Sequence, residues 1–380
     1  MNEDLHNTKE GLRFIIAGGG TGGHIFPAIA IANALKRKLP EAQILFVGAK
    51  GKMEMTRVPQ AGYEIRGIDI AGYNRGSILK NASLPFKILK SFNQVRKIVR
   101  AFHPDAVIGV GGYSTFPVLR TAQNKGIPTF IHEANSFAGK SNILLAKKAT
   151  KVFVATHGME RFFPREKIVV TGNPVRKIIA DSTVSKEDAL SFFGLDKNKK
   201  TILAIGGSLG AKSINEVFAR HINELNLLHI QLIWQTGETT GRAFMERGKS
   251  YKNVWVSDFI QEMDKAYAAA DVVVSRAGAM SVSELCVAKK AAVFVPYPFA
   301  AEDHQTMNAR YLMERNAALM VKDSEAQTKL FSTIVTLIND RQKMEELERN
   351  IAKYATTNAN EIIANEIINI TEKKEALTNE

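Results

Sequence analysis

The sequence predicts an α/β fold made of two Rossmann-like domains that face a central cleft. Short apolar runs alternate with amphipathic helical patterns along both halves of the chain, as in parallel β-sheets covered by helices. The order strand, glycine-rich loop, helix occurs near the start of the chain and again after residue 200. A length of 380 residues with 45% hydrophobic residues is sufficient for two such cores.

The first copy of this pattern, FIIAGGGTGGHIFPAIAIANALKRKL, covers residues 14–39. Its apolar start, residues 14–17, predicts a strand buried on both faces, and Pro27 suits the first position of a helix over residues 27–38. The glycines between them let the backbone turn tightly and approach a ligand. Because the first N–H groups of a helix have no partner within it, we expect this loop to bind a phosphate.

The glycine spacing also fits the G-x-G-x-x-G fingerprint of dinucleotide-binding proteins, with Gly18, Gly20 and Gly23 in the three positions. That fingerprint is completed by an Asp or Glu about 20 residues further on, at the end of the second strand. Here the strand expected at residues 43–47 is followed by Gly-Ala-Lys. A nicotinamide-dependent oxidoreductase is therefore disfavoured but stays an alternative.

The remaining apolar and amphipathic segments predict the other elements. In the first half, strands are expected at residues 43–47, 106–110, 129–132 and 151–154, and helices at residues 84–102 and 141–147. In the second half, the strand TILAI is followed by strands expected at residues 230–235, 254–256, 271–274, 291–296 and 318–321. The polar residues 181–200, with one short helix near residues 186–193, are predicted to connect the domains.

We place the first domain at residues 1–178 and the second at residues 179–350. The tail from residue 341 is helical in pattern, with Ile362, Ile363, Ile367 and Ile370 at helical spacing. A helix with one apolar stripe must pack on another surface. We expect the helix at about residues 355–375 to join the first domain.

The formal net charge of +13 is concentrated in the first half. Residues 1–180 hold 27 Lys and Arg against 11 Asp and Glu, whereas residues 181–380 hold 24 against 27. This imbalance predicts an anionic partner, either phospholipid headgroups or nucleic acid. No zinc-finger spacing, RNP-type motif or repeat supports nucleic acid, so we expect none. The sequence has no run of 18 apolar residues, and its single cysteine, Cys286, fits a reducing compartment.

Two further loops in the second half carry groups suited to a nucleotide. The loop GGSLG at residues 206–210 presents backbone N–H groups and the hydroxyl of Ser208, and SRAGAMSVSEL at residues 275–285 leads into a helix. Two helix N-termini near one ligand suit a diphosphate. Glu284, one turn into the second helix, could accept both ribose hydroxyls or simply interact with the helix dipole.

Seven motifs resemble those of one enzyme family, in order and spacing, across nearly the whole chain. They are GGGTGGHIFPAIAIA, GGYSTFP, HEANSFAGKSN, TGNPVR, GGSLGAKSIN, SDFIQEMDKAYAAADVVVSRAGAMSVSEL and EDHQTMNA. The family is that of the peptidoglycan N-acetylglucosaminyltransferases, which move GlcNAc from UDP-GlcNAc to lipid-linked N-acetylmuramyl-pentapeptide. The resemblance implies the two-domain type B glycosyltransferase fold, with the donor in the second domain and the acceptor in the first. It also implies a peripheral protein at the cytoplasmic face of the bacterial inner membrane.

The resemblance further implies which residues bind the donor. Arg176 and Ser208 would lie near the phosphates, and Ile260 would hold the uracil through its backbone. Glu284 would take the ribose, while Gln305 and Asn308 would bind the sugar hydroxyls, with His304 beside them. The helix start facing the phosphates comprises Ala279, Met280, Ser281, Val282 and Ser283.

On the acceptor side, the resemblance places four residues of the first domain at the donor diphosphate and the acceptor. They are Thr21, Gly22, Gly23 and Asn135. The implied reaction is one displacement with inversion, in which the muramyl C4 hydroxyl attacks the anomeric carbon and UDP leaves. Helix N-termini and Arg176 would stabilise the leaving group, so no cofactor and no metal site are expected.

This reaction requires a base, for which the sequence offers two candidates. His24 ends the glycine loop, and its ordinary pKa of about 6.5 suits proton uptake near neutrality. Glu133 is the second candidate, although this carboxylate could instead orient His132 or its loop. A nucleotide-sugar 2-epimerase of the same fold is an alternative function, which would share the donor half but need no lipid acceptor.

The basic first half contains a candidate membrane surface. Between Asp69 and Asp105 the sequence has seven basic residues and no acidic one. One helical stripe of Ile88, Phe92, Val95, Val99 and Phe102 is expected to face the sheet. The expected membrane contacts lie outside that stripe and are Ile78, Leu79, Lys80, Phe86, Lys87 and Lys90. Apolar side chains ringed by cations suit an anionic headgroup surface.

Overall fold

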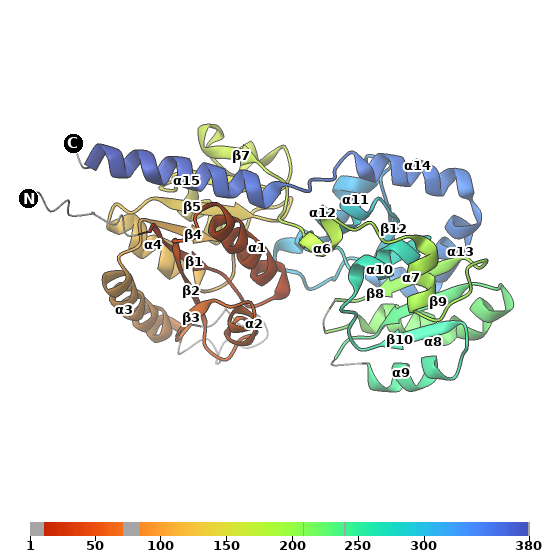
Figure 1. Ribbon diagram of the computed structural model, residues 1–380. Coiled ribbons are helices and arrows are strands. Elements are labelled where there is room, and N and C mark those ends of the chain that lie inside the picture. The colour runs from red at the N-terminus through yellow and green to blue at the C-terminus, as the bar shows by residue number, and fades with distance from the viewer. Residues whose placement is uncertain (1–10, 71–83, 208, 239–240, 379–380) are drawn as a thin grey trace, which may run out of the picture. The chain divides into compact units, whose positions relative to one another are not determined.

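The fold is known from a computed structural model, in which residues 11–70, 84–207, 209–238 and 241–378 are described. The chain divides into two compact units, and both consist of a sheet covered by helices (Figure 1). The first unit comprises residues 1–134, 138–174 and 358–380, and the second comprises residues 135–137 and 175–357. Apart from residues 135–137, the chain passes from the first unit to the second after residue 174, close to the expected boundary after residue 178.

The first unit is built on a parallel sheet of seven strands in the order β3-β2-β1-β4-β5-β6-β7. Its strands are β1 Arg13–Ala17, β2 Gln43–Ala49, β3 Glu64–Ile68, β4 Ala106–Gly109, β5 Thr129–Glu133, β6 Lys151–Val154 and β7 Ile168–Val170. Its helices are α1 Gly22–Lys38, α2 Glu54–Gln60, α3 Leu84–Phe102, α4 Thr115–Asn124, α5 Lys140–Ala146 and α15 Ala359–Thr378. The strands β3 and β7 were not predicted: both are edge strands that are only partly buried, β3 contains polar residues, and β7 has only three residues.

The predicted opening of the first unit is correct except at the helix start. The strand β1 is central, and Phe14, Ile15 and Ile16 are fully buried, as expected for a parallel strand covered on both faces. The helix α1 begins at Gly22, so Pro27 lies inside it rather than at its first position. Since proline lacks only its own N–H, it removes a single bond to the carbonyl of residue 23 near the helix start.

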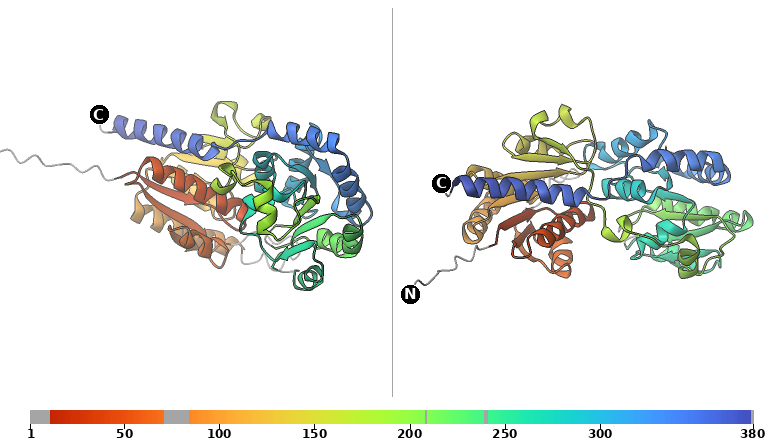
Figure 2. Two further views of the ribbon diagram at one scale, coloured as in Figure 1. Left: turned by 45° about the vertical axis from the view of Figure 1, so that its right-hand side comes forward. Right: turned by 45° about the horizontal axis from the view of Figure 1, so that its top comes forward.

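The C-terminal helix α15 packs beside α1 in the first unit (Figures 1 and 2). Ile363 and Ile367 are fully buried in the same apolar cluster as the inner face of α1. At the surface, Glu361 of α15 forms ion pairs with Arg37 and, at 3.0 Å, with Lys38. The tail thus belongs to the sheet of the first unit although it follows the second unit in sequence.

The second unit is built on a parallel sheet of six strands in the order β10-β9-β8-β11-β12-β13. Its strands are β8 Thr201–Ile205, β9 Gln231–Gln235, β10 Val254–Ser257, β11 Val272–Ser275, β12 Ala291–Phe294 and β13 Leu319–Met320. Its helices are α6 Lys177–Ala180, α7 Lys186–Phe192, α8 Lys212–Leu227, α9 Arg242–Lys249, α10 Met263–Ala269, α11 Ala279–Ala288, α12 His304–Met313, α13 Phe331–Asn339 and α14 Arg341–Ala352. Alternate residues of β8 enter two apolar clusters, one on each face of the sheet.

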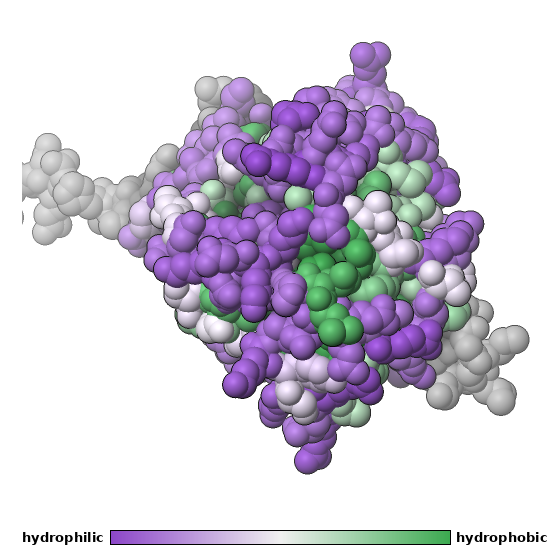
Figure 3. Space-filling view, turned by 90° about the vertical axis from the view of Figure 1, so that its right-hand side faces the viewer, coloured by the Kyte–Doolittle hydropathy of each residue, from purple (hydrophilic) through white to green (hydrophobic). Residues whose placement is uncertain are grey.

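The prediction that residues 181–200 connect the domains is wrong. Ala189, Leu190 and Phe193 are buried in the core of the second unit, where α7 packs on α10. The segment looked like a linker because its charged residues outnumber the few apolar ones that face inward. The surface of this unit seen in Figure 3 is mainly hydrophilic, with one compact hydrophobic area. Within the residues that the structure describes, no helix is long and apolar enough to cross a membrane.

Candidate functional site

Both sheets reverse their strand order at the strand that carries the glycine loop. In the first unit β1 lies between β2 and β4, and in the second unit β8 lies between β9 and β11. In open parallel sheets, ligands bind beyond the carboxyl ends of the strands at such a switch point. The predicted site residues of each unit follow these strand ends, so each unit has one candidate site.

His24 lies in the first turn of α1 and is half-buried. Its Nδ1 atom lies 3.1 Å from the carbonyl oxygen of Gly19. Because a carbonyl can only accept, Nδ1 must carry the proton of this hydrogen bond. In the neutral ring Nε2 is then the unprotonated nitrogen, which is the form that a general base requires.

The loop after β4 holds the other side of this imidazole. Gly111 has a φ of +94°, and a Cβ atom there would lie 2.7 Å from Nε2 of His24. A residue other than glycine would therefore displace the ring. The carbonyl of Gly111 also accepts a bond of 3.3 Å from the N–H of Gly19, so two glycine loops meet around His24.

Glu54, at the start of α2, lies against the first glycine loop and was not predicted as a site residue. Its side chain is 1% exposed, and its Oε2 and Oε1 accept bonds of 2.8 Å from the N–H of Gly20 and 2.9 Å from that of Ala49. A Cβ atom at Gly19, where φ is +151°, would overlap this carboxylate. The sequence did offer a signal, since Glu54 is the one acidic residue between Glu41 and Glu64.

This contact corrects the expectation that the first loop as a whole binds phosphate. The N–H of Gly20 already donates to a carboxylate, and a phosphate at that position would meet a like charge. Only the N–H groups of Gly22 and Gly23, ahead of the first intrahelical bonds of α1, keep the geometry of a helix start. The same contact argues against a dinucleotide pyrophosphate at the first loop.

Glu133 ends β5 and is buried, with 3% of its surface exposed. Its Oε2 accepts bonds of 3.0 Å from the N–H of Gly139 and 2.8 Å from Nδ2 of Asn142. These contacts orient the loop that leads into α5, which is the role that the sequence left open for this residue. The neighbouring His132 is also buried, and burial lowers its pKa to about 4.

In the second unit, Arg176 and Glu284 form a bidentate ion pair. The Nε and Nη2 atoms of Arg176 lie 2.7 Å and 2.9 Å from the two carboxylate oxygens of Glu284. Burial opposes the charged guanidinium, yet the bonds and charge of Glu284 hold the pKa of Arg176 above its ordinary value. The carboxylate of Glu284 is buried, with 6% of the residue exposed.

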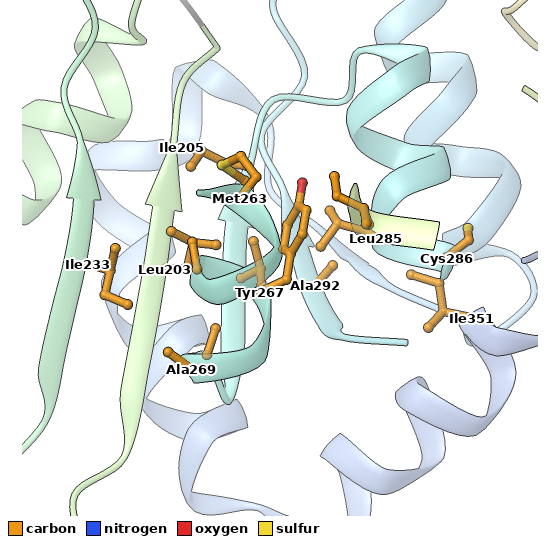
Figure 4. Close-up of a cluster of buried hydrophobic side chains, with 14 of the residues drawn as sticks. Leu203, Ile205, Ile233, Met263, Tyr267, Ala269, Leu285, Cys286, Ala292 and Ile351 are labelled. Carbon is orange, nitrogen blue, oxygen red and sulfur yellow. The ribbon is translucent and has the colours of Figure 1, made fainter. Parts of the chain in front are cut away.

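Tyr267 of α10 completes this group and was not predicted. Its hydroxyl donates a bond of 3.2 Å to Oε2 of Glu284. The ring lies among the apolar side chains of one core cluster, with its hydroxyl at the edge of that cluster (Figure 4). Burial and the adjacent Glu284 charge raise the pKa of Tyr267 well above its ordinary value, so the hydroxyl stays protonated. The hydrogen bond from the buried Tyr267 thus helps to fix the ion pair of Arg176 and Glu284.

Ile260 is bonded to the second glycine loop through Gln235, another residue that the sequence reasoning missed. The N–H of Ile260 donates 3.1 Å to Oε1 of Gln235, and Nε2 of Gln235 donates 3.0 Å to the carbonyl of Gly207. The carbonyl of Ile260 is therefore the backbone group that could bind the base of a nucleotide. Gln235 could have been noticed as a polar residue that ends the apolar strand β9.

Asn308, which is 3% exposed, binds the segment of residues 135–137 that belongs to the second unit. Its Nδ2 lies 3.3 Å from Oδ1 of Asn135 and 3.1 Å from the carbonyl of Ala277, and its Oδ1 accepts 3.0 Å from the N–H of Ser136. Asn135 is therefore in contact with Asn308, one of the predicted donor residues. Gln305, about one turn before Asn308 on α12, accepts 2.9 Å from the N–H of Tyr297.

The other predicted residues are placed as follows. Residues 279–283, which comprise the first turn of α11, are half-buried, and the N–H of Val282 is the first to bond back to Gly278. Thr21 is the N-cap of α1, and His304 starts α12 with Nδ1 2.7 Å from the carbonyl of Ala301. Ser208, Ile78, Leu79 and Lys80 lie outside the described residues.

The first two turns of α3 have the expected exposed apolar character. Phe86 is 76% exposed, and Leu89, which was not predicted as a contact, is 65% exposed. Lys87 is exposed beside them, whereas Lys90 pairs with Asp69 at 3.0 Å. That ion pair helps to lower the pKa of Asp69 to about 2. Of the stripe expected to face the sheet, Val95 and Val99 are buried but Ile88 is 37% exposed.

Comparison with known proteins agrees with this architecture. The model of the glycosyltransferase family 28 N-terminal domain matches residues 14–154, and that of its C-terminal domain matches residues 201–365. A crystal structure of Acinetobacter baumannii MurG has 31% identity and a TM-score of 0.74, and the match covers 94% of this chain and 99% of that one. Two α/β units with these loops define a two-domain glycosyltransferase of the type B fold, as the motifs predicted.

Two relatives carry the name UDP-N-acetylglucosamine--N-acetylmuramyl-(pentapeptide) pyrophosphoryl-undecaprenol N-acetylglucosamine transferase. The protein of Phocaeicola vulgatus is 49% identical over 96% of this chain and 98% of its own length, and that of Bacteroides fragilis is 47% identical over 98% and 100%. The chain belongs to glycosyltransferase family 28 and, within it, to the family of these transferases. A UDP-GlcNAc 2-epimerase from Neisseria meningitidis, at 15% identity and a TM-score of 0.66, shares the fold alone.

Proposed function

We propose that this protein is a hexosyltransferase that moves GlcNAc from UDP-GlcNAc to the C4 hydroxyl of lipid-linked N-acetylmuramyl-pentapeptide, with inversion at the anomeric carbon. The observation that carries the proposal is the sequence identity of 49% and 47%, over 96% and 98% of the chain, to the two transferases named above. The match to both domain models of one glycosyltransferase family supports it. The nucleotide-sugar epimerases share the fold at much lower identity and do not compete with it.

The donor would bind in the second unit, with its ribose on Glu284. Three of the roughly four acceptor positions of this carboxylate are taken by Arg176 and Tyr267. Two ribose hydroxyls therefore require Arg176 to release at least one of its bonds. The diphosphate offers the guanidinium a new anionic partner, so Arg176 would move from the carboxylate towards the phosphates.

The other donor contacts would be made by backbone and amide groups. The N–H groups of residues 279–281 and the loop that includes Ser208 would receive the diphosphate, and the carbonyl of Ile260 would receive the uracil. Gln305 would bind a sugar hydroxyl, whereas the amide of Asn308 already has partners and would position the surrounding loops. Thr21, Gly22 and Gly23 would lie at the diphosphate and acceptor from the first unit.

His24 would act as the general base. Its Nδ1–H is directed at Gly19, so Nε2 would take the proton of the C4 hydroxyl as that oxygen attacks the anomeric carbon. The bond between the anomeric carbon and the phosphate oxygen breaks, and UDP leaves with the negative charge that Arg176 and the α11 N–H groups stabilise. Glu133 would position the loop before α5, and the mechanism needs no cofactor.

We also propose that the protein is peripheral at the cytoplasmic face of the bacterial inner membrane. Phe86 and Leu89 expose apolar surface beside Lys87, and the half of the chain that carries them has the excess of positive charge. Apolar side chains among cations suit insertion into anionic headgroups, with each cation near the surface adding about 1 kcal/mol. Such binding would bring the protein to an acceptor whose lipid remains in the bilayer.

The function is tested by incubating radiolabelled UDP-GlcNAc with the protein, with and without the lipid-linked muramyl acceptor. We expect UDP release only with acceptor, together with a labelled lipid-linked disaccharide. Acceptor-independent formation of UDP-ManNAc would overturn the proposal in favour of an epimerase.

A further inference from the structure

Glu54 and His24 contact opposite ends of one peptide group. The N–H of Gly20 donates to Oε2 of Glu54 at 2.8 Å, and the carbonyl of Gly19 in the same peptide faces Nδ1 of His24 at 3.1 Å. A peptide group is planar, and its N–H and carbonyl point in opposite directions. The carboxylate, the peptide and the imidazole therefore form one continuous hydrogen-bonded chain.

We propose that Glu54 is a positioning residue that acts on His24 through the Gly19–Gly20 peptide. This inference rests on the proposed role of His24 as the base. The carboxylate fixes the peptide so that its carbonyl accepts from Nδ1 of His24, which leaves Nε2 to accept the substrate proton. It also polarises the peptide, because hydrogen bonds in a chain strengthen one another.

The surroundings of Glu54 fit this role better than that of a solvent-facing charge. The side chain is 1% exposed, and it is held from the other side by the N–H of Ala49. The carboxylate of Glu54 thus takes the place at the first glycine loop where the sequence predicts a bound phosphate.

The charged and titratable groups near His24 set the expected direction of its pH response. Glu54 lies beyond the peptide, Tyr113 of the loop after β4 lies near Gly20, and His132 on β5 is buried, with its pKa lowered to about 4, so it is uncharged near neutrality. A nearby negative charge favours the imidazolium form. Removal of the Glu54 charge should therefore lower the pKa of His24.

The test compares Glu54→Gln with wild type and with Glu64→Gln, which removes an exposed carboxylate from β3 of the same unit. We expect kcat in Glu54→Gln to fall about 10- to 100-fold, since a displaced base costs that much, while the Kd for UDP stays unchanged. The acid limb of the kcat profile should move to lower pH by about half a unit or more. Glu64→Gln should match wild type, and Glu54→Asp, which keeps the charge, should keep the wild-type acid limb.

A measurement independent of activity follows the imidazole directly. In nitrogen-15 NMR of histidine-labelled protein, His24 should be the Nδ1–H tautomer in wild type, and Glu54→Gln should lower its pKa and reduce that tautomer. Circular dichroism and a thermal melt show whether the variant is folded, and Glu54→Met, which also removes the charge, replaces it if it is not. An unchanged tautomer and pKa in a folded variant would overturn the inference. If instead the tautomer responds but His24→Ala keeps full activity, the proposed base is wrong while the coupling stands.

Discussion

The two glycine loops have similar sequences and occupy the same position in their sheets, yet they contain different partners. The loop of residues 18–23 encloses the carboxylate of Glu54, which accepts from Gly20. In the loop of residues 206–210, the bonds found among the described residues are neutral, from Gln235 and Gly210 to the carbonyl of Gly207. One loop therefore resembles an anion site that is already filled, and the other has the character of an anion site for a ligand.

This difference shows why a glycine pattern alone does not identify a ligand. Both sequences allow tight turns and exposed N–H groups, but the partner of those groups comes from another segment of the chain. In the first unit that partner is Glu54 at the start of α2, which bonds to the peptide that faces His24, the proposed base. We expect substitutions at the first loop to affect the rate of the reaction and substitutions at the second unit's site to affect donor binding.

The largest effect is expected at the first loop. His24→Ala should lower kcat by about 10² to 10⁴ fold because the general base is lost. The Kd of UDP, measured by calorimetry, should stay within about twofold of wild type, since the base makes no ground-state contact with the nucleotide. A loss of kcat below about tenfold would transfer the role to another group or to solvent.

His132, on β5 of the first sheet, should affect the free energy of unfolding rather than the rate of the reaction. The pKa of His132 is lowered to about 4 by burial, whereas in the unfolded chain it is about 6.5. The unfolded state then binds a proton that the folded state excludes, so stability falls as pH drops from about 6.5 to 4. Wild type should lose about 2 to 3 kcal/mol more than His132→Gln between pH 7.5 and 4.5 in urea titrations.

His157→Gln, at an exposed position of the same unit, is the matched control for that titration. It should keep the wild-type pH dependence. Parallel curves for wild type and His132→Gln would show that His132 titrates normally in the folded protein.

In the second unit, Glu284→Gln should weaken UDP binding by about 1.5 to 3 kcal/mol, as expected for loss of charge-assisted hydrogen bonds. Glutamine is preferable to alanine because Glu284 is buried and paired with Arg176. Glu345→Gln, an ion-paired but exposed carboxylate of the same unit, is the control. Unchanged calorimetric affinity in the Glu284 variant would remove the ribose contact from the mechanism.

The smallest effect is expected at the surface. Replacing Phe86 and Leu89 by Ser should weaken co-sedimentation with anionic vesicles several-fold, because partial burial of each exposed side chain at the membrane surface contributes about 0.5 kcal/mol. Leu227→Ser removes an equally exposed leucine from the second unit and should have no effect. Equal loss in both variants, or no loss in either, would show that Phe86 and Leu89 do not form the membrane-binding surface.

The sequence was sufficient for the central strands, the long helices and the family, because these depend on local apolar patterns and ordered motifs. It placed α3 at its observed bounds and identified both strand–loop–helix units. It was insufficient for contacts that depend on tertiary structure. Glu54 joins residues 34 positions away in sequence, and Arg176 reaches a carboxylate 108 positions away, so no spacing rule connects them.

The most direct test of the difference between the loops is a titration of the protein with UDP, followed by backbone amide NMR. We predict large shifts for the amides of Gly206, Gly207, Gly210 and Ala279, and no comparable shift for Gly20, whose N–H is bonded to Glu54. Shifts at Gly20 as large as those in the second loop, with the second loop unaffected, would contradict the assignment of the donor to the second unit and of the filled anion site to the first.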